Sequence, residues 1–333
     1  MANPSHHAVR GSRRSEDRVD LRMMTGRVGT RIVQTEGVVV TTPRPLRVLI
    51  AGAGGMLGRT LVRVLAEPPE ILVTGAARRS GAAQIHLDAI GGYRAIAETL
   101  DVVGEVDVVV NAVGLLGSLI SPDRPSSLRD ARIVNTDFPQ ALAAVTDARG
   151  IRLVHVSTDG VFRGDADHCG EMADDWSDDV YGGSKRDGEP VTATAISVRS
   201  SFVGVDRVNR RGLLEWLRAQ PPGASVPGYV NHRWNGLTTL ELAEAVRHLL
   251  DERCFAAARQ EGPVHHVART EIVTKFDLLE SLVEGFGLPV RIEPVEAETE
   301  MTRTLEPCPG ALAGACPRRS LAEALHQLRE SEE

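Results

Sequence analysis

A short apolar run that ends in a glycine-rich turn and continues as an amphipathic helix constrains this chain most. Residues 46–51 read LRVLIA, a pattern typical of a buried strand, and the turn GAGGMLG occupies residues 52–58. Apolar residues then recur at helical spacing as far as Leu65, and Pro68 and Pro69 end the helix. A strand that passes directly into a helix in this way is typical of a parallel α/β sheet.

Strands and helices alternate through the first half of the chain, and further helices are predicted in the second half. Further strands are predicted at residues 71–74, 85–87, 106–112, 152–156 and 195–198. Helices are predicted at residues 93–103, 128–149, 213–219, 239–252, 275–286 and 320–331. This order predicts a Rossmann-like, doubly wound parallel sheet over residues 46–205. Residues 206–333 are predicted to be mainly a smaller C-terminal substrate-binding lobe, with elements that return to the sheet.

Residues 1–45 differ from the rest of the chain. They contain eight arginines and four acidic residues, and their apolar clusters are confined to Ile32-Val33 and Val38–Val40. The segment lacks the apolar core of 7–15 residues that a secretory signal needs. We predict a disordered N-terminal extension, and the alternative is a basic arm that binds a partner.

The composition excludes several classes of protein. The chain has 333 residues and a formal charge of −7, which argues against a nucleic-acid partner held by a basic face. No apolar run approaches the ~18–20 residues needed to span a membrane. The cysteines (169, 254, 308 and 316) have no zinc spacing, no metal site is predicted, and a disulfide between Cys308 and Cys316 is left open. Scattered thiols favour a reducing cytosol, so the expected location is cytoplasmic.

The glycine-rich turn predicts a dinucleotide site. Gly52 would allow the tight turn, Gly55 would let a pyrophosphate approach the backbone, and Gly58 would let the helix pack on the strand. The first helical residues, Met56 and Leu57, would offer N–H groups and the positive end of the helix dipole to the phosphates. The alternative is a plain tight turn.

Residues at the ends of the next strands indicate which dinucleotide is bound. An acidic residue after the second strand would bind a ribose 2′-hydroxyl and favour NAD, but Arg78 and Arg79 occur there instead. Two guanidinium groups can hold a 2′-phosphate, so we predict NADPH, with NADH as a possibility and a solvated surface pair as the alternative. Asp88 could reach the adenine amine. The small residues after the strand at 106–112 would leave room for the cofactor, and these are Ala112, Val113 and Gly114.

Tyr181-Gly-Gly-Ser-Lys185 is the strongest catalytic signal. The chain has three tyrosines and two lysines, so a chance Tyr-x-x-x-Lys has an expectation of roughly 0.02. On a helix the two side chains share one face. The lysine charge is predicted to lower the phenol pKa, which suits a general acid for a carbonyl oxygen near neutral pH. The alternative is a surface pair.

Two further polar residues join this candidate site. Thr158 follows a predicted strand that ends at Val156, and a hydroxyl at the carboxyl end of a parallel strand faces the ligand crevice. It could hold the substrate oxygen beside Tyr181, or it could cap a turn. Asn135 lies within a predicted helix, where it could bind a backbone carbonyl or a water in a proton path.

These motifs together resemble the extended short-chain dehydrogenase/reductases, and the most similar branch is the dTDP-4-dehydrorhamnose reductases. The resemblance covers roughly residues 46–330 and includes STDGVF at residues 157–162, VNTDFPQAL at residues 134–142, VRSSFVG at residues 198–204 and GLTTLELA at residues 236–243. It implies reduction of a 4-keto sugar nucleotide by NAD(P)H. Thr158, Tyr181 and Lys185 would be catalytic, with Asn135 as a fourth member, and a homodimer would form through the helices that carry Asn135 and Tyr181.

One position departs from the family pattern. Sugar-nucleotide dehydratases usually have an Asp-Glu pair after the threonine, whereas here Asp159 is followed by Gly160, which speaks against dehydration. The reductases often have a bulkier residue there, so Gly160 leaves the shape of the pocket open. An epimerase and a non-catalytic NADP-binding subunit are the alternative functions.

The predicted lobe offers candidate substrate contacts. An aromatic ring can stack on a nucleobase and an arginine can pair with a diphosphate. The polar and aromatic run Asn231–Asn235 is the preferred region, with a surface loop as its alternative. For Trp216, which lies inside a short predicted helix, ordinary core packing is the favoured alternative. The residues assigned to substrate are Asp159, Trp216, Tyr229, Arg233 and Trp234.

Overall fold

The computed structural model describes residues 30–35, 38–78, 84–307 and 310–332, and it divides into two units, residues 1–44 and 45–333. In the first unit β1 (Thr30–Thr35) and β2 (Val38–Pro43) form an antiparallel hairpin. The sequence predicts a disordered extension over residues 1–45, and this prediction is wrong for the two strands. Residues of high strand propensity, valine, isoleucine and threonine, supply most of both strands and account for the difference. Residues 1–29 lie outside the described part, so their disorder stays a prediction.

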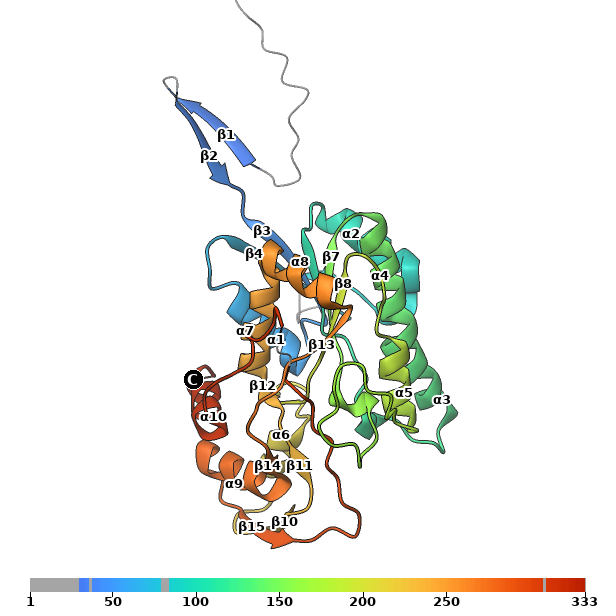
Figure 1. Cartoon of the computed structure of the whole chain (residues 1–333), viewed down its shortest axis with the longest axis vertical. Coiled ribbons are helices and arrows are strands. Elements are labelled where there is room, and N and C mark those ends of the chain that lie inside the picture. Colours follow the sequence, from blue (N-terminus) through green and yellow to red (C-terminus); the bar gives the residue numbers. More distant parts are fainter. Residues whose placement is uncertain (1–29, 36–37, 79–83, 308–309, 333) are drawn as a thin grey trace, which may run out of the picture. The chain divides into compact units, whose positions relative to one another are not determined.

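The second unit is organised around a seven-stranded sheet in the order β13-β8-β7-β6-β3-β4-β5 (Figure 1). All six neighbouring pairs are parallel, so the predicted Rossmann-like sheet is confirmed. Its strands are β3 (Leu46–Ala51), β4 (Ile71–Ala77), β5 (Ile85–His86), β6 (Val108–Asn111), β7 (Arg152–Val156), β8 (Ala195–Arg199) and β13 (Val264–His266). The chain reverses its direction of travel across the sheet between β3 and β6, which is where doubly wound sheets bind ligands.

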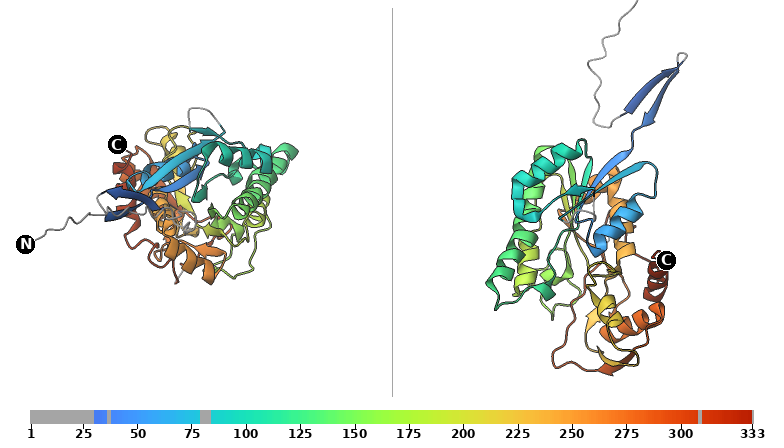
Figure 2. Two further views of the ribbon diagram at one scale, coloured as in Figure 1. Left: turned by 90° about the horizontal axis from the view of Figure 1, so that it is seen from above. Right: turned by 180° about the vertical axis from the view of Figure 1, so that it is seen from behind.

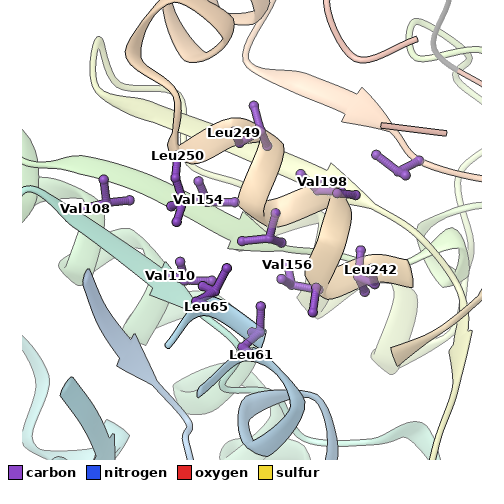
Figure 3. Packing of buried hydrophobic residues seen from close by; sticks show 14 of the residues in the cluster. Leu61, Leu65, Val108, Val110, Val154, Val156, Val198, Leu242, Leu249 and Leu250 are labelled. Atoms are coloured by element: carbon purple, nitrogen blue, oxygen red, sulfur yellow. The ribbon is translucent and has the colours of Figure 1, made fainter. Parts of the chain in front are cut away.

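Helices cover both faces of this sheet. On one face α1 (Met56–Leu65) and α7 (Thr239–Leu250) bury leucines against valines of the strands (Figure 3), and α8 (Glu252–Glu261) adds Phe255 and Ala258 to the same cluster. On the other face α2 (Gly92–Val103) and α4 (Phe138–Ala148) pack on β3, β6 and β7. Figure 2 shows this second group together, drawn in cyan and green. After the smaller lobe begins, α7, α8 and β13 return to the sheet, whereas the substrate-binding role of the lobe stays a prediction.

The predicted long helix at residues 128–149 has three parts in the structure. It starts with α3 (Pro125–Ala131), continues through a π-helical turn at Arg132–Asp137, and ends with α4. A π turn inserts one extra residue and changes the direction in which its side chains point. Asn135, a candidate site residue, lies in this turn and is fully buried.

The smaller lobe packs around its own apolar cluster. Its helices are α6 (Leu213–Arg218), α9 (Lys275–Phe286) and α10 (Leu321–Glu330). Short two-stranded sheets pair β10 (Ser225–Tyr229) with β15 (Arg291–Val295), β11 (Arg233–Trp234) with β14 (Val273–Thr274), and β12 (Leu237–Thr238) with β9 (Phe202–Val203). None of the helices in the described residues is long and apolar enough to cross a membrane.

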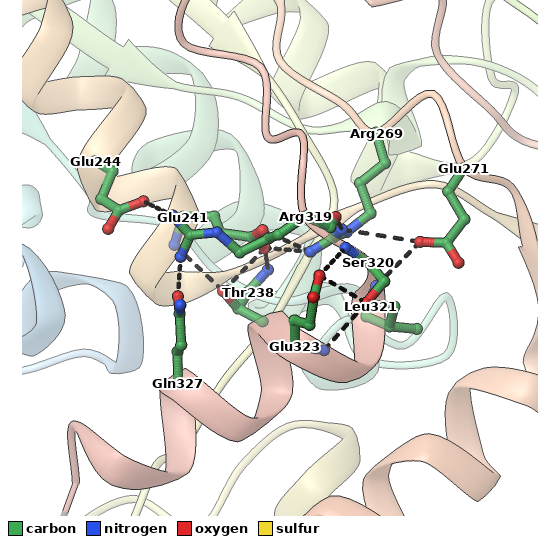
Figure 4. Close-up of polar contacts among 10 residues, drawn as sticks. All are labelled: Thr238, Glu241, Glu244, Arg269, Glu271, Arg319, Ser320, Leu321, Glu323 and Gln327. Carbon is green, nitrogen blue, oxygen red and sulfur yellow. Dashed lines mark hydrogen bonds and ion pairs between the residues drawn. The ribbon is translucent and has the colours of Figure 1, made fainter.

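A buried ion pair fastens the C-terminal segment to α7. Arg269 donates to both carboxylate oxygens of Glu241 at 2.6 Å and to the backbone carbonyl of Arg319 at 2.6 Å (Figure 4). Both members of the pair are 2% exposed. Glu241 also forms a capping box with Thr238, so the same carboxylate caps the start of α7 and, through Arg269, is linked to Arg319 just before α10.

Candidate active site

The glycine-rich turn has the geometry that the sequence predicts. Gly52 adopts a φ of +89°, and a Cβ on it would lie 2.8 Å from the backbone of Ala112. A Cβ on Gly58 would lie only 2.0 Å from the Gly52 carbonyl oxygen, so α1 packs against the turn more closely than any side chain allows. The crowded sides of the turn therefore require glycine.

The side of the turn at Gly55 is not crowded by neighbouring atoms. A Cβ on Gly55 would meet only the Gly52 oxygen, at an ordinary 3.4 Å. No side chain caps α1, and its first turn holds no acidic residue. The N–H groups of Met56 and Leu57 therefore lie at a helix start without an intrahelical partner, as phosphate binding requires. These residues fit a dinucleotide pyrophosphate, and that binding stays a prediction.

The residues predicted around the adenosine are less constrained. Arg78 is exposed directly after β4, whereas Arg79 lies outside the described residues. The carboxylate of Asp88 accepts a hydrogen bond of 3.2 Å from the N–H of Ile90 and caps a short 3₁₀ turn. The preference for a 2′-phosphate and the contact of Asp88 with adenine both stay predictions.

The segment after β6 reaches the catalytic residues. The N–H of Val113 donates to the Asn111 side chain at 3.0 Å, which turns the chain after Ala112. A Cβ on Gly114 would lie 3.9 Å from Oδ1 of Asn135 and 4.0 Å from Nζ of Lys185. The strand end predicted to border the cofactor thus lies beside two of the predicted catalytic side chains.

Both the oxygen and the nitrogen of the Asn135 side-chain amide bind this segment. Its Oδ1 accepts from the Leu115 N–H at 2.7 Å, and its Nδ2 donates to the Leu115 carbonyl at 3.1 Å and to Oγ of Ser184 at 3.2 Å. The predicted contact with a backbone carbonyl is therefore present. Because Ser184 lies in α5 (Val180–Asp187), Asn135 joins the segment after β6 to the helix that carries Tyr181 and Lys185.

Tyr181, Lys185 and Thr158 converge at the carboxyl end of β7. The Lys185 ammonium is buried and donates to the Val156 carbonyl at 2.9 Å. The Tyr181 phenol shares a hydrogen bond with the side chain of Thr158. A Cβ on Gly160 would lie 2.8 Å from the Tyr181 ring, so glycine at this position makes room for the tyrosine.

The predicted pKa of Tyr181 is wrong in direction. Burial raises the pKa of the phenol above its ordinary value, and the hydrogen bond to Thr158 opposes this only in part. The sequence had predicted a lowered pKa from the charge of Lys185. Burial lowers the pKa of Lys185 itself to about 8, against the opposing charge of Glu189. Desolvation, which depends on tertiary packing, thus dominates both groups.

Asp159 and a distant arginine complete the polar surroundings. Oδ1 of Asp159 accepts from Oγ1 of Thr158 at 3.0 Å. Burial raises the pKa of this carboxyl, and the charge of Arg303 opposes the rise. The Arg303 Nε is buried and has no hydrogen-bond partner in the described part of the chain. Sequence reasoning missed Arg303, because no local pattern indicates that the segment before α10 returns to Asp159.

The predicted substrate residues have varied surroundings. The rings of Tyr229 and His232 lie 4.6 Å apart, Arg233 forms an ion pair of 3.7 Å with Asp167, and the Trp234 indole donates to Ser201. Trp216 is 43% exposed, which argues against its alternative as a core residue. The roles of all these residues in substrate binding stay predictions.

The two asparagines of the preferred region have structural partners. Asn231 exchanges hydrogen bonds with the backbone of Ala297, and buried Asn235 does so with the backbone of Leu305. They fasten the segment that carries Arg303 across the lobe. Among the described residues no group of His, Cys, Asp or Glu side chains is arranged to hold a metal ion.

Comparison with known proteins agrees with this geometry. Residues 46–330 match the model of the RmlD substrate binding domain family. The chain belongs to this family. A relative from Haloferax volcanii, named "Probable low-salt glycan biosynthesis reductase Agl14", is 30% identical over 72% of this chain and 79% of its own length. A dTDP-4-dehydrorhamnose reductase from Mycobacterium tuberculosis is 27% identical over 85% of this chain and 92% of its own length.

Solved structures agree on the fold. The crystal structure of dTDP-4-dehydrorhamnose reductase from Bacillus anthracis, in complex with NADP, has a TM-score of 0.70, an identity of 18%, and coverage of 86% of this chain and 99% of that chain. A dTDP-glucose 4,6-dehydratase from the same organism, in complex with NAD, has a TM-score of 0.65 at 14% identity, with coverage of 86% and 97%. These likenesses confirm the predicted fold.

Proposed function

We propose that this protein is an NADPH-dependent reductase of a keto group on a sugar nucleotide, with a dTDP-linked 4-keto-6-deoxy sugar as the substrate class. The observation that carries the proposal is the convergence of Thr158, Tyr181 and Lys185 at the sheet edge that also holds the glycine turn. The reductases among the relatives support the reaction class. A cytoplasmic homodimer is part of the same proposal.

The residues present fit a nicotinamide dinucleotide. The open face of Gly55 and the uncapped start of α1 would hold its pyrophosphate. Gly114 would leave space for the nicotinamide beside Lys185, and the Lys185 ammonium would bind the ribose. Reduced nicotinamide, when bound, supplies the hydride that a ketone carbon accepts.

The protein residues would supply a proton and orientation. The Tyr181 phenol, kept protonated by its raised pKa, would donate its proton to the developing alkoxide. The Thr158 hydroxyl, which donates to Asp159 in this structure, would turn to donate its hydrogen bond to the same oxygen. Asn135 would position Lys185 indirectly by holding α5 against the segment after β6.

The replacement Tyr181→Phe tests the assignment. It should lower kcat by about 10²–10⁴-fold, because the proton donor is lost, and leave the dissociation constant of NADPH nearly unchanged. Absorbance of NADPH and NADH with a dTDP-4-keto-6-deoxy sugar measures turnover. Tyr93→Phe is the matched control, since Tyr93 is exposed on α2 and its replacement should change neither quantity. Unaltered turnover in Tyr181→Phe would contradict the proposal.

Two alternatives predict different outcomes of the same assay. An epimerase would interconvert sugar nucleotides without releasing oxidised cofactor, and a non-catalytic subunit would bind NADPH without turnover. Stoichiometric release of NADP⁺ with product separates the reductase from both. The intact set of Thr158, Tyr181 and Lys185 favours the reductase over a protein that only binds the cofactor.

A further inference from the structure

A buried carboxylate lies directly behind the proposed catalytic residues. Glu189 accepts a hydrogen bond of 2.6 Å from Oγ of Ser157, and two from the Arg199 guanidinium, at 2.8 Å to Oε1 and 2.7 Å to Oε2. The side chains of Glu189 and Arg199 are 6% and 4% exposed. Three elements thus meet on one carboxylate: the end of β7, the segment after α5, and β8.

Glu189 and its partner Ser157 both lie close in sequence to the proposed catalytic residues. Ser157 immediately precedes Thr158, and Lys185 stands four residues before Glu189. The N–H of Glu189 donates to the Arg186 carbonyl at 3.0 Å, so the end of α5 itself presents the carboxylate. Moving Glu189 would therefore disturb the strand end that carries Thr158 and the helix end that carries Lys185 together.

The Arg199 guanidinium also has partners other than Glu189. Its guanidinium carbon lies 5.1 Å from the ring centre of Phe162 and 5.2 Å from that of Trp176. Its NH1 lies 3.4 Å from Nε2 of His266 and donates to the Glu171 carbonyl at 3.3 Å. Arg199 is thus a rigid support on which Glu189 is oriented.

Stability alone is a weak explanation for this pair. Taking two charges out of water is costly, and a well-packed apolar pair of similar volume is often as stable. Lys185 and Glu189 bind adjacent residues of the chain, since the ammonium donates to the Val156 carbonyl and the carboxylate accepts from Ser157. Burial of the site favours loss of the proton from this ammonium. A fixed negative charge at this place has a direct electrostatic consequence for that lysine.

We propose that Glu189 is a positioning residue. Its carboxylate ties the strand end before Thr158 to the helix end after Lys185, and its charge keeps the Lys185 side chain an ammonium ion. The consequence for turnover rests on the proposed function, whereas the effect on Lys185 does not.

Other titratable groups around Lys185 do not replace this charge. Tyr181 lies on the same helix, Asp159 follows β7, and the charge of Lys185 helps to hold the pKa of buried His155 well below its ordinary value. The π turn presents uncharged Asn135, while its charged residues are exposed. These are Arg132 and Asp137, which pair with each other at 3.7 Å. Glu189 is the group whose charge raises the pKa of Lys185.

The chain allows a direct test because its lysines are Lys185 and Lys275. Burial lowers the pKa of both to about 8. Protein labelled with ¹³Cε-lysine therefore gives two lysine signals, which Lys275→Arg assigns. In Glu189→Gln, the titration midpoint of Lys185 should fall by about one pH unit or more, while that of Lys275 stays in place.

Control variants separate charge from general damage. Glu241→Gln removes a carboxylate from the other buried arginine pair, Arg269–Glu241, and should leave the Lys185 midpoint unchanged. Glu189→Asp retains the charge, so its Lys185 titration midpoint should stay close to that of the unaltered protein. If Glu189→Gln fails to fold, the double variant Glu189→Gln with Arg199→Gln leaves no unpaired buried charge. Its Lys185 midpoint should still fall, but by less, because the loss of the Arg199 charge offsets part of the loss of the Glu189 charge.

The enzyme assay gives a second readout. Since Lys185 acts as an ammonium ion, activity is lost as pH rises through its pKa, and Glu189→Gln should move the alkaline limb of kcat/KM to lower pH by the shift seen in the lysine spectrum. An unchanged Lys185 midpoint in folded Glu189→Gln overturns the inference. A shifted midpoint in a protein without reductase activity would instead support the inference and reject the proposed function.

Discussion

At the scale of single residues, two glycines are required by neighbouring atoms rather than by their own flexibility. Gly58 lets α1 approach the Gly52 carbonyl, and Gly160 makes room for the Tyr181 ring. The first requirement follows from a motif within seven residues of sequence. The second could not be read locally, because Gly160 and Tyr181 lie on different elements.

We predict that Gly58→Ala weakens both stability and NADPH binding. Its Cβ would lie 2.0 Å from a backbone oxygen, so α1 has to move away from the turn, at a cost of about 1–3 kcal/mol. Urea unfolding and the dissociation constant of NADPH measure the two effects. Gly285→Ala in α9 is the control, because its Cβ would make an ordinary 3.6 Å contact with Leu325. That variant should gain about 0.5–1 kcal/mol.

At the scale of elements, residues close together in sequence specify where a helix starts, whereas the contacts between helices join residues far apart in sequence. Capping boxes start α7, α9 and α10, at Thr238, Thr274 and Ser320. The predicted boundaries of these helices agree with the structure within a few residues. The buried pair that joins α7 to the segment before α10 connects residues 28 apart, and no periodic pattern indicates it.

We predict that Arg269→Met lowers the free energy of unfolding by about 3–5 kcal/mol, because it leaves the Glu241 carboxylate buried without its partner. Urea unfolding followed by circular dichroism measures the loss. NADPH binding should persist under native conditions, since the pair lies outside the glycine turn. Arg94→Met breaks an exposed ion pair with Glu98 and should cause no measurable change. Equal effects of the two variants would contradict the argument.

At the scale of the whole molecule, buried histidines make stability depend on pH. Burial lowers the pKa of His266 to about 4, so the folded protein binds this proton less readily than the unfolded chain. Between pH ~6.5 and ~4 the unfolded state binds the proton and the folded state does not. The contribution of His266 to stability is therefore fully present above pH ~6.5 and is lost as pH falls toward 4.

We predict that His266 contributes about 3 kcal/mol to the loss of stability on acidification, from a pKa difference of about 2.5 and 1.36 kcal/mol for each pH unit. The free energy of unfolding in urea, measured from pH 7 to pH 4, should show a flatter slope in His266→Gln. His326→Gln is the control, because His326 is exposed on α10 and should leave the slope unchanged. A slope that His266→Gln does not alter would refute this assignment.

The features that the sequence determined by itself are those encoded within one element and its turn. The strand, turn and helix from Leu46 to Leu65, the parallel sheet, and the shared helix of Tyr181 and Lys185 follow from periodicity and spacing over a few residues. The hairpin at residues 30–43 was missed, because a short two-stranded pattern is a weaker signal than a helix period.

The tertiary structure alone decided which groups surround the proposed chemistry. Arg303 reaches Asp159 across more than a hundred residues, and Glu189 collects partners from β7 and β8. The tertiary structure also reversed the expected direction of the pKa shift of Tyr181, because desolvation depends on everything packed around the phenol. Residue type and spacing specify which groups can react, whereas burial and distant charges set their protonation, and both arise only when the chain folds.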